Sequence, residues 1–122
     1  WKFLYQNYSS ELDSAQNYDG MAFAQELIIY NSEILQTVRT DDNSNIFRAL
    51  CELSDTLCII ESDTTTTFGE FKVSLKKANV TNAIYLDMGR GWNYAWYRDN
   101  DSIIELHPKI HYYCTNWITF YK

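Results

Sequence analysis

Apolar residues in this chain occur in short runs separated by small polar residues, a pattern that is typical of a sheet-rich fold. The run at residues 83–86 is bounded by polar residues and predicts a buried strand. Two pairs of runs predict β-hairpins, residues 21–30 with 33–38 and residues 46–53 with 56–61. The polar residues between these runs predict turns and loops.

Weaker patterns extend this picture toward both ends of the chain. Residues 1–5 and 103–106 predict short strands, and residues 112–121 predict a longer aromatic strand. Residues 10–20 predict a short helix, because a serine stands at its start and a glycine at its end.

The strongest helical pattern covers residues 67–78. Thr67 and Glu70 have the spacing of a capping box, and Asn79 is a suitable left-handed terminator. The apolar residues recur at intervals of three and four and so share one face: Phe68, Phe71, Leu75 and Ala78. A hairpin, this helix and the returning strand at 83–86 together predict an α+β fold, a mixed, mostly antiparallel sheet with one main helix packed on it.

The composition is that of one folded domain over residues 1–122. The chain is 46% hydrophobic, with four glycines and one proline. A net charge of −6 argues against a nucleic-acid partner, because phosphate contacts supply most of that affinity. No apolar run reaches the ~20 residues of a membrane span. Because the first residue is Trp1, we expect an upstream piece: a signal peptide, more of a larger chain, or a segment removed by proteolysis.

Three cysteines leave the redox compartment open. Cys51 and Cys58 flank the predicted turn at residues 53–56 and would face each other across a hairpin. That arrangement fits a cross-strand disulfide, and it equally fits a pair of neighbouring thiols. Cys114 is left over in either case.

No motif in the chain predicts a metal site. His107 and His111 are four residues apart, but Pro108 between them argues against a shared helical face. Residues 99–102 begin like a calcium loop, but two isoleucines follow where a further ligand and the required glycine should be. We therefore expect no metal ligands, and the sequence identifies no cofactor.

Chemistry-bearing residues gather after the predicted strand at 83–86. Asp87 ends that strand, and the loop behind it carries Gly89, Arg90, Gly91, Trp92 and Asn93. A carboxylate at a strand end, a cation on a flexible loop and nearby aromatic rings are what a small polar ligand needs. The same residues also fit a strand, a turn and a second strand with core aromatics, and composition does not separate the two interpretations.

Two further charged residues extend this candidate site. Arg48 lies in an apolar run, where a cation needs a carboxylate partner or an anionic ligand unless it faces water at the start of the strand. Asp63 precedes the helix and offers a second carboxyl group if its turn folds beside the strand end. Otherwise Asp63 serves to cap the helix region.

The order of these segments is similar to that of a known family. Residues 47–63, Phe-Arg-Ala-Leu-Cys-Glu-Leu-Ser-Asp-Thr-Leu-Cys-Ile-Ile-Glu-Ser-Asp, are followed by Thr-Phe-Gly-Glu-Phe at 67–71 and Asn-Ala-Ile-Tyr-Leu-Asp-Met-Gly-Arg-Gly at 82–91. Together they resemble the phosphodiester glycosidase domain, the type found in the enzyme that uncovers mannose 6-phosphate on lysosomal hydrolases. The aromatic ending at residues 115–121 resembles a branch of that family common in secreted proteins of gut Bacteroidetes.

The resemblance implies a secreted, periplasmic or cell-surface hydrolase that cleaves sugar-1-phosphodiesters or related glycans. It implies Asp87 and Asp63 as catalytic carboxyl groups. The implied substrate-binding residues are Arg48, Gly89, Arg90, Gly91, Trp92 and Asn93.

The chain departs from the family in two respects. Where the family has a run of glycines and then a serine after Leu-Asp, this chain has Met-Gly-Arg-Gly-Trp at residues 88–92. The family's earlier Asn-Gly segment is not visible, which implies that an N-terminal part of the domain lies outside residues 1–122. The substituted glycines favour the alternative function, a non-catalytic carbohydrate-binding or surface interaction domain of the same fold.

Overall fold

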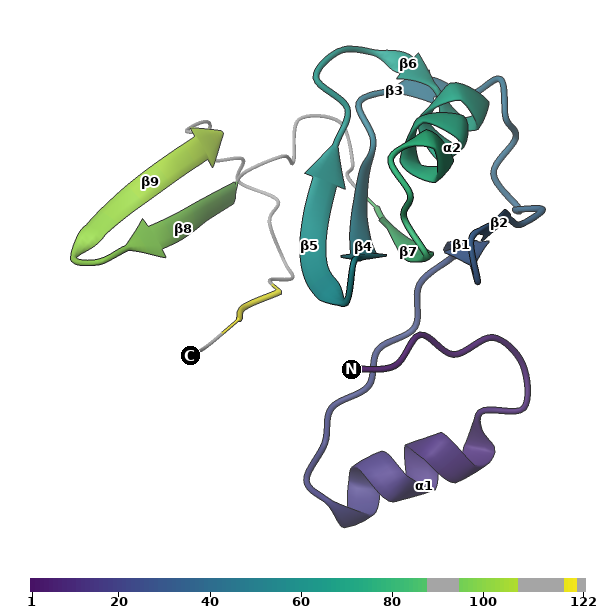
Figure 1. Cartoon of the computed structure of the whole chain (residues 1–122), viewed down its shortest axis with the longest axis vertical. Helices are drawn as coiled ribbons and strands as arrows, with labels where there is room; N and C mark the ends of the chain where they lie inside the picture. Colours follow the sequence, from purple (N-terminus) through teal and green to yellow (C-terminus); the bar gives the residue numbers. More distant parts are fainter. Residues whose placement is uncertain (88–94, 108–117, 121–122) are drawn as a thin grey trace. The chain divides into compact units, whose positions relative to one another are not determined.

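The fold is built on a five-stranded antiparallel sheet with the strand order β2-β1-β7-β4-β5 (Figure 1). The structure is a computed structural model that describes residues 1–87, 95–107 and 118–120. The chain divides into two compact units, Trp1–Asp87 and Met88–Lys122, and the sheet belongs to the first. Its strands are β1 (Leu27–Tyr30), β2 (Glu33–Ile34), β4 (Arg48–Leu53), β5 (Thr56–Glu61) and β7 (Asn82–Leu86).

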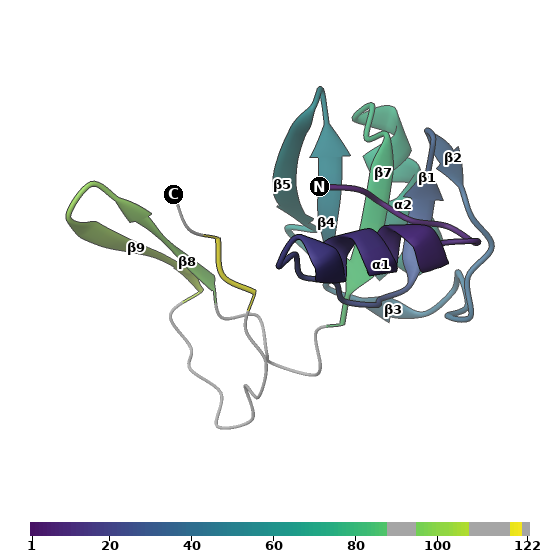
Figure 2. The same ribbon diagram turned by 90° about the horizontal axis from the view of Figure 1, so that it is seen from below.

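The central strand β7 and both predicted hairpins are observed, but the first hairpin pairs residues 27–30 with 33–34 and not the predicted 21–30 with 33–38. In each hairpin two residues with positive φ make the turn, Asn31 and Ser32 between β1 and β2, and Ser54 and Asp55 between β4 and β5. Strand β7 lies between β1 and β4, so both of its edges are paired within the sheet (Figure 2). The predicted α+β fold with a mostly antiparallel sheet is therefore observed.

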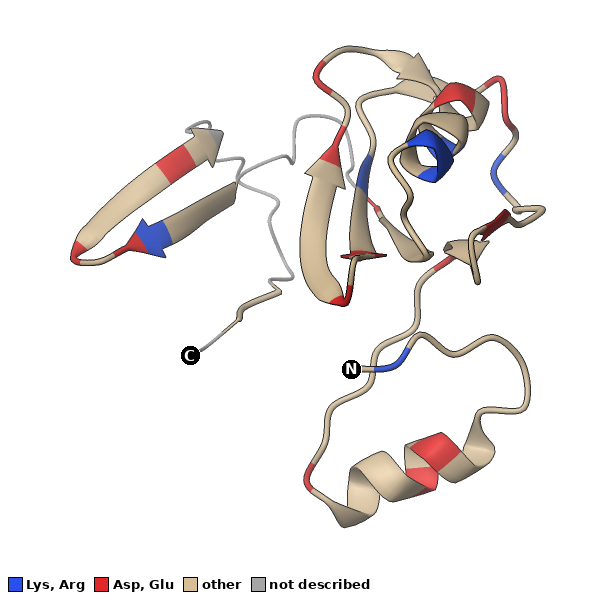
Figure 3. Cartoon of the chain, in the orientation of Figure 1, with Lys and Arg blue, Asp and Glu red and all other residues tan. Residues whose placement is uncertain are grey.

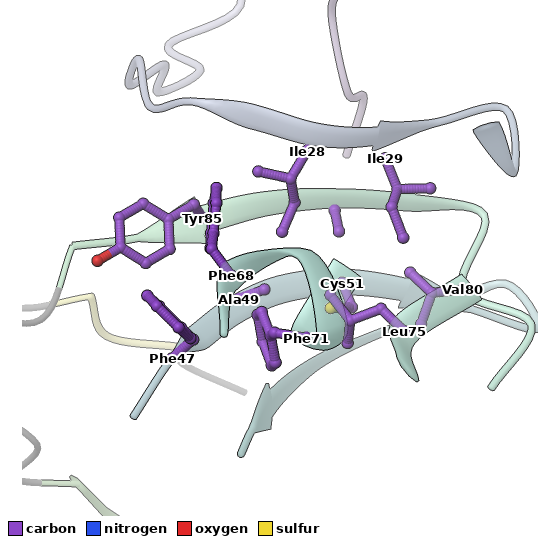
Figure 4. Close-up of a cluster of buried hydrophobic side chains, with 11 residues drawn as sticks. Ile28, Ile29, Phe47, Ala49, Cys51, Phe68, Phe71, Leu75, Val80 and Tyr85 are labelled. Atoms are coloured by element: carbon purple, nitrogen blue, oxygen red, sulfur yellow. The ribbon is translucent and has the colours of Figure 1, made fainter. Parts of the chain in front are cut away.

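Helix α2 (Phe68–Lys77) packs on one face of the sheet, as the sequence predicts. Thr67 caps its start by accepting a hydrogen bond from the backbone of Glu70, whose carboxylate bonds back to the Thr67 backbone. The helix ends before Asn79, which has the expected positive φ. Its apolar face closes a core shared with the sheet (Figure 4): Ile28, Ile29, Phe47, Ala49, Cys51, Phe68, Phe71, Leu75, Val80, Ala83 and Tyr85.

A small two-stranded ladder ties the loop after β2 to the start of α2. Strand β3 (Ser44–Asn45) pairs with β6 (Thr66–Thr67), immediately before the helix begins. The backbone amides of Phe68 and Gly69 donate to the carbonyls of Asn43 and Asp41. These bonds satisfy two of the amides that a helix start leaves without an intrahelical partner.

The N-terminal segment corrects one prediction. Residues 1–5 form no strand; instead the Trp1 indole donates to the Glu52 carboxylate, and the Tyr5 ring lies 5.6 Å from that of Tyr30. The predicted helix that follows is observed as α1 (Ser9–Asn17), but Tyr8 is its N-cap and no side chain caps it, so the expected serine cap is wrong. None of its residues is buried, so α1 adds little to the core. No helix in the described residues is long and apolar enough to cross a bilayer.

In the second unit the described residues form a hairpin of β8 (Ala95–Asp99) and β9 (Ser102–His107). It contains the predicted strand at 103–106 and the turn before it. Of the aromatic strand predicted at 112–121, residues 118–120 are described and form no strand, and the others lie outside the described residues.

Cys51 and Cys58 face each other directly across β4 and β5, as the sequence predicts, and both are free thiols. Cys51 lies in the core beneath α2, and its burial raises the pKa of its thiol to about 12. Burial also raises the pKa of the half-buried Cys58. Cys114 and His111 lie outside the described residues.

Candidate functional site

Asp87 stands at the exposed end of the central strand. Side chains alternate along β7, so Ala83 and Tyr85 point toward α2 and join the core. Asp87 continues on the same side, because the Tyr85 hydroxyl donates a hydrogen bond of 3.2 Å to its carboxylate. The Asp87 side chain is 68% exposed. A buried tyrosine thus holds a carboxylate at the surface.

Arg39, from the loop after β2, faces this carboxylate. Its guanidinium lies 3.7 Å from Asp87, 4.7 Å from the centre of the Tyr85 ring and 5.7 Å from that of Phe68. The two rings stabilise the cation through their negative faces. Its Nε is buried and has no hydrogen-bond partner among the described residues. Arg39 therefore has a donor that its present contacts do not use.

The backbone of the same loop is anchored to the strand beside β7. The amides of Val38 and Arg39 both donate to the carboxylate of Glu26, which precedes β1. The Glu26 carbonyl in turn accepts from the backbone amide of Tyr85. The pairing of β1 with β7 is therefore one of the contacts that hold the backbone at Arg39.

A second cation lies near the ring of Phe68. The ammonium group of Lys72 in α2 lies 5.2 Å from the centre of that ring and pairs with Asp41 at 2.6 Å. It also donates to the Thr37 hydroxyl and to the Leu35 carbonyl. The Lys72 side chain is only 3% exposed, so its charge is closed to solvent. The carboxylate of Asp41, which is itself exposed, neutralises it.

Arg48 lies elsewhere. It pairs with the Glu61 carboxylate on β5, so the partner that an arginine in an apolar strand needs is supplied by the protein. In the register of the sheet Arg48 stands opposite Leu86, and cross-strand partners share a face. Leu86 and Asp87 are consecutive, and Asp87 is bonded to Tyr85 on the helix side. Arg48 and Asp87 therefore point to opposite faces of the sheet.

Asp63 borders a different hollow. It follows β5 and, with Glu61 and Ser62, lines an open cavity of about 300 Å³ against Phe71 and Ser74 of α2. The expected convergence of Arg48, Asp63 and Asp87 on one cleft is not observed, because each has its own neighbours. The other predicted binding residues, Gly89, Arg90, Gly91, Trp92 and Asn93, lie outside the described residues.

Arg39 is the residue that the sequence did not single out. It stands alone between a predicted strand and a polar loop, and no spacing connects it to Asp87. The proximity of Arg39 to Asp87 can be inferred only once β1 is known to pair with β7, because that pairing brings the loop after β2 to the end of the central strand.

Another exposed ion pair among the described residues joins Lys76 of α2 to Glu33 at 2.8 Å, away from the end of β7. Acidic positions are spread over helices, strands and loops of both units (Figure 3). Among the described residues no three His, Cys, Asp or Glu side chains gather in a way that would hold a metal ion. A comparison of the chain with protein-family models, with curated proteins and with solved structures finds no match.

Proposed function

We propose that the end of β7 binds an anionic saccharide and hydrolyses its anomeric bond, with a sugar-1-phosphodiester or a related glycan as the substrate. The observation that carries this proposal is the pair of Arg39 and Asp87, an arginine 3.7 Å from a carboxylate that is 68% exposed. A guanidinium suits phosphate oxygens, and a carboxylate suits the positive charge that develops at an anomeric carbon. The resemblance to phosphodiester glycosidases supports the same substrate class.

The local charge favours a substrate with one negative charge. Among the described residues Arg39 is the cation next to Asp87, and its side chain is 27% exposed. The nearby Lys72 is sealed and is neutralised by Asp41. A phosphodiester carries a single charge, whereas a phosphate monoester carries nearly two at pH 7. Beside the negative Asp87, the site therefore favours diesters over monoesters.

The leaving group reduces the need for a second catalytic carboxyl group. Hydrolysis adds water to the anomeric carbon, breaks its bond to the phosphate oxygen and releases a free sugar and a phosphate monoester. The second pKa of such a monoester is about 6, so it departs without strong general-acid help. Asp87 then takes the proton from water and stabilises the oxocarbenium-like transition state, and Arg39 balances the charge that accumulates on the phosphate. Asp63, beside its separate cavity, takes no step in this scheme.

Hydrolysis of glucose 1-(4-nitrophenyl phosphate) and its N-acetylglucosamine and mannose analogues tests the proposal. Release of reducing sugar should be abolished in Asp87→Asn, while the affinity for the diester is retained. Asp55→Asn, at the exposed turn between β4 and β5, is the matched control and should keep full activity. Hydrolysis that persists in Asp87→Asn would remove Asp87 from the mechanism.

The alternative is a non-catalytic carbohydrate-binding domain, favoured by the substituted glycines at residues 88–92. It predicts saturable binding of the diesters without turnover in the native protein. Calorimetric titration at concentrations suited to weak ligands separates the two functions. If the protein neither binds nor hydrolyses these diesters, both the hydrolase and the carbohydrate-binding functions are wrong. The surface interaction domain is then the remaining alternative.

A further inference from the structure

Lys72 is a buried charged residue with no role in the scheme above. Its ammonium group contacts three residues of the loop after β2, at Leu35, Thr37 and Asp41. Thr37 lies two residues before Arg39 and Asp41 lies two residues after it. One cation of the helix thus holds the chain on both sides of Arg39.

The loop is closed around this contact. The Thr37 hydroxyl donates to the backbone carbonyl of Arg39 at 2.9 Å, which makes a tight turn. The Asp41 carbonyl accepts from the backbone amide of Gly69 in the first turn of α2. A Cβ added at Gly69 would lie 3.1 Å from the Cβ of Asp41, so loop and helix approach each other closely there.

Phe68 completes the connection. Its ring is buried in the core and has Lys72 at 5.2 Å and Arg39 at 5.7 Å. The Arg39 guanidinium in turn contacts Tyr85, the residue that holds Asp87. A continuous set of contacts therefore runs from Lys72 through the loop to Arg39 and Asp87.

We infer that Lys72 is a positioning residue for the site at the end of β7: through Thr37 and Asp41 it fixes the loop that presents Arg39 to the anionic group of the ligand. The inference rests on the proposed function for the ligand, but not for the geometry. Lys72 itself touches no ligand, since its side chain is closed to solvent.

The geometry is tested without a ligand, by the NMR signal of the Arg39 Nε–H group. Ring currents of Tyr85 and Phe68 should move the chemical shift of this proton away from that of an exposed arginine. Lys72→Met should return it toward that value. Asp41→Asn, which alters the exposed end of the same ion pair, should act in the same direction if Lys72→Met folds poorly. Asp42→Asn, at the exposed neighbouring aspartate, is the matched control and should leave the signal in place.

The functional consequence is tested with glucose 1-(4-nitrophenyl phosphate) in an Asp87→Asn background, where no turnover is expected. Lys72→Met should weaken binding on the order of tenfold, as the loss of one charge-assisted contact predicts. It should add no further loss to Arg39→Gln. An Arg39 signal that stays at its native position in both Lys72→Met and Asp41→Asn overturns the inference. If the signal moves but the native protein binds no diester, the positioning role stands and the proposed function fails.

Discussion

The Arg39 guanidinium lies 3.7 Å from the Asp87 carboxylate and over the ring of Tyr85, which hydrogen-bonds the same carboxylate. One tyrosine thus contacts both charged groups of the candidate site. Its own position is fixed in the core, where it is 3% exposed. A rigid aromatic side chain therefore sets the distance between a cation and an anion at the surface.

Arg39→Gln should lower kcat/KM for sugar phosphodiesters by roughly ten- to hundredfold, the equivalent of about 1.5–3 kcal/mol for a hydrogen bond to a charged group. The free energy of unfolding should fall by about 1–3 kcal/mol, because the ion pair with the exposed Asp87 contributes at most about 1 kcal/mol and the contacts with the Tyr85 and Phe68 rings about 1–2 kcal/mol. Steady-state kinetics and urea unfolding measure the two effects. A stability loss without a kinetic effect would make Arg39 purely structural.

The native protein should prefer glucose 1-(4-nitrophenyl phosphate) to glucose 1-phosphate, because the described residues place one cation, Arg39, beside Asp87, and one cation balances one negative charge rather than two. Competition between the two compounds measures the preference. Added salt should weaken binding of the diester only modestly, since one partly buried cation is involved. Equal or tighter binding of the monoester would contradict the charge argument.

Thr67→Ala should destabilise the first unit by about 1 kcal/mol, because it removes the side chain that caps α2. Thr67→Ser retains the hydroxyl and serves as the control. Thermal unfolding followed by circular dichroism measures the difference. The same helix end donates backbone hydrogen bonds to Asn43 and Asp41. A loss of stability much larger than about 1 kcal/mol in Thr67→Ala would therefore indicate that these loop contacts are lost together with the cap.

Glu52 should make the stability fall in acid. Hydrogen bonds from the side chain of Asn82, and then from Trp1 and Thr81, lower the pKa of its carboxylate. When folding lowers the pKa of a carboxylate, that carboxylate stabilises the folded protein at pH values above its unfolded-state pKa of about 4.3. That contribution is lost as the pH falls from there through the lowered pKa. In Glu52→Gln the unfolding free energy should change less steeply across this pH range.

Cys51 should resist alkylation in the folded protein. With its pKa raised to about 12, roughly one thiol in ten thousand is ionised at pH 8, and the thiolate is the reactive form. Cys58, whose pKa is also raised, should react slowly but before Cys51. Mass spectrometry after timed iodoacetamide treatment measures both rates, and denaturant should make the two rates similar.

Local sequence patterns were sufficient for the elements that local interactions decide. The capping box of α2, the turn residues of the hairpins and three of the four apolar helix residues act within a few positions and are observed as predicted, whereas Ala78 is the exposed C-cap and lies outside the core. The predicted strand at residues 1–5 was wrong because strand pairing depends on a distant partner. The apolar residues there contact the sheet without joining it, as the Trp1 bond to Glu52 illustrates.

The candidate site required knowledge of register. The sequence identified Asp87, because a carboxylate directly after a buried strand is a local feature. It did not identify Arg39, whose approach depends on the pairing of β1 with β7. Arg48 was expected beside Asp87, but alternation along paired strands places it on the other face with Glu61. A shift of one residue in the register of β4 would move Arg48 to the other face of the sheet, and composition carries no information on register.

The dependence of the Arg39 and Asp87 pair on the joining of β1 to β7 links ligand recognition to folding itself. An unfolded chain separates the two groups, so a compound that needs both binds only the native state. Such a compound raises the melting temperature in proportion to the logarithm of its concentration above its dissociation constant. A thermal-shift screen of anionic sugars therefore tests the proposed binding even where no turnover occurs.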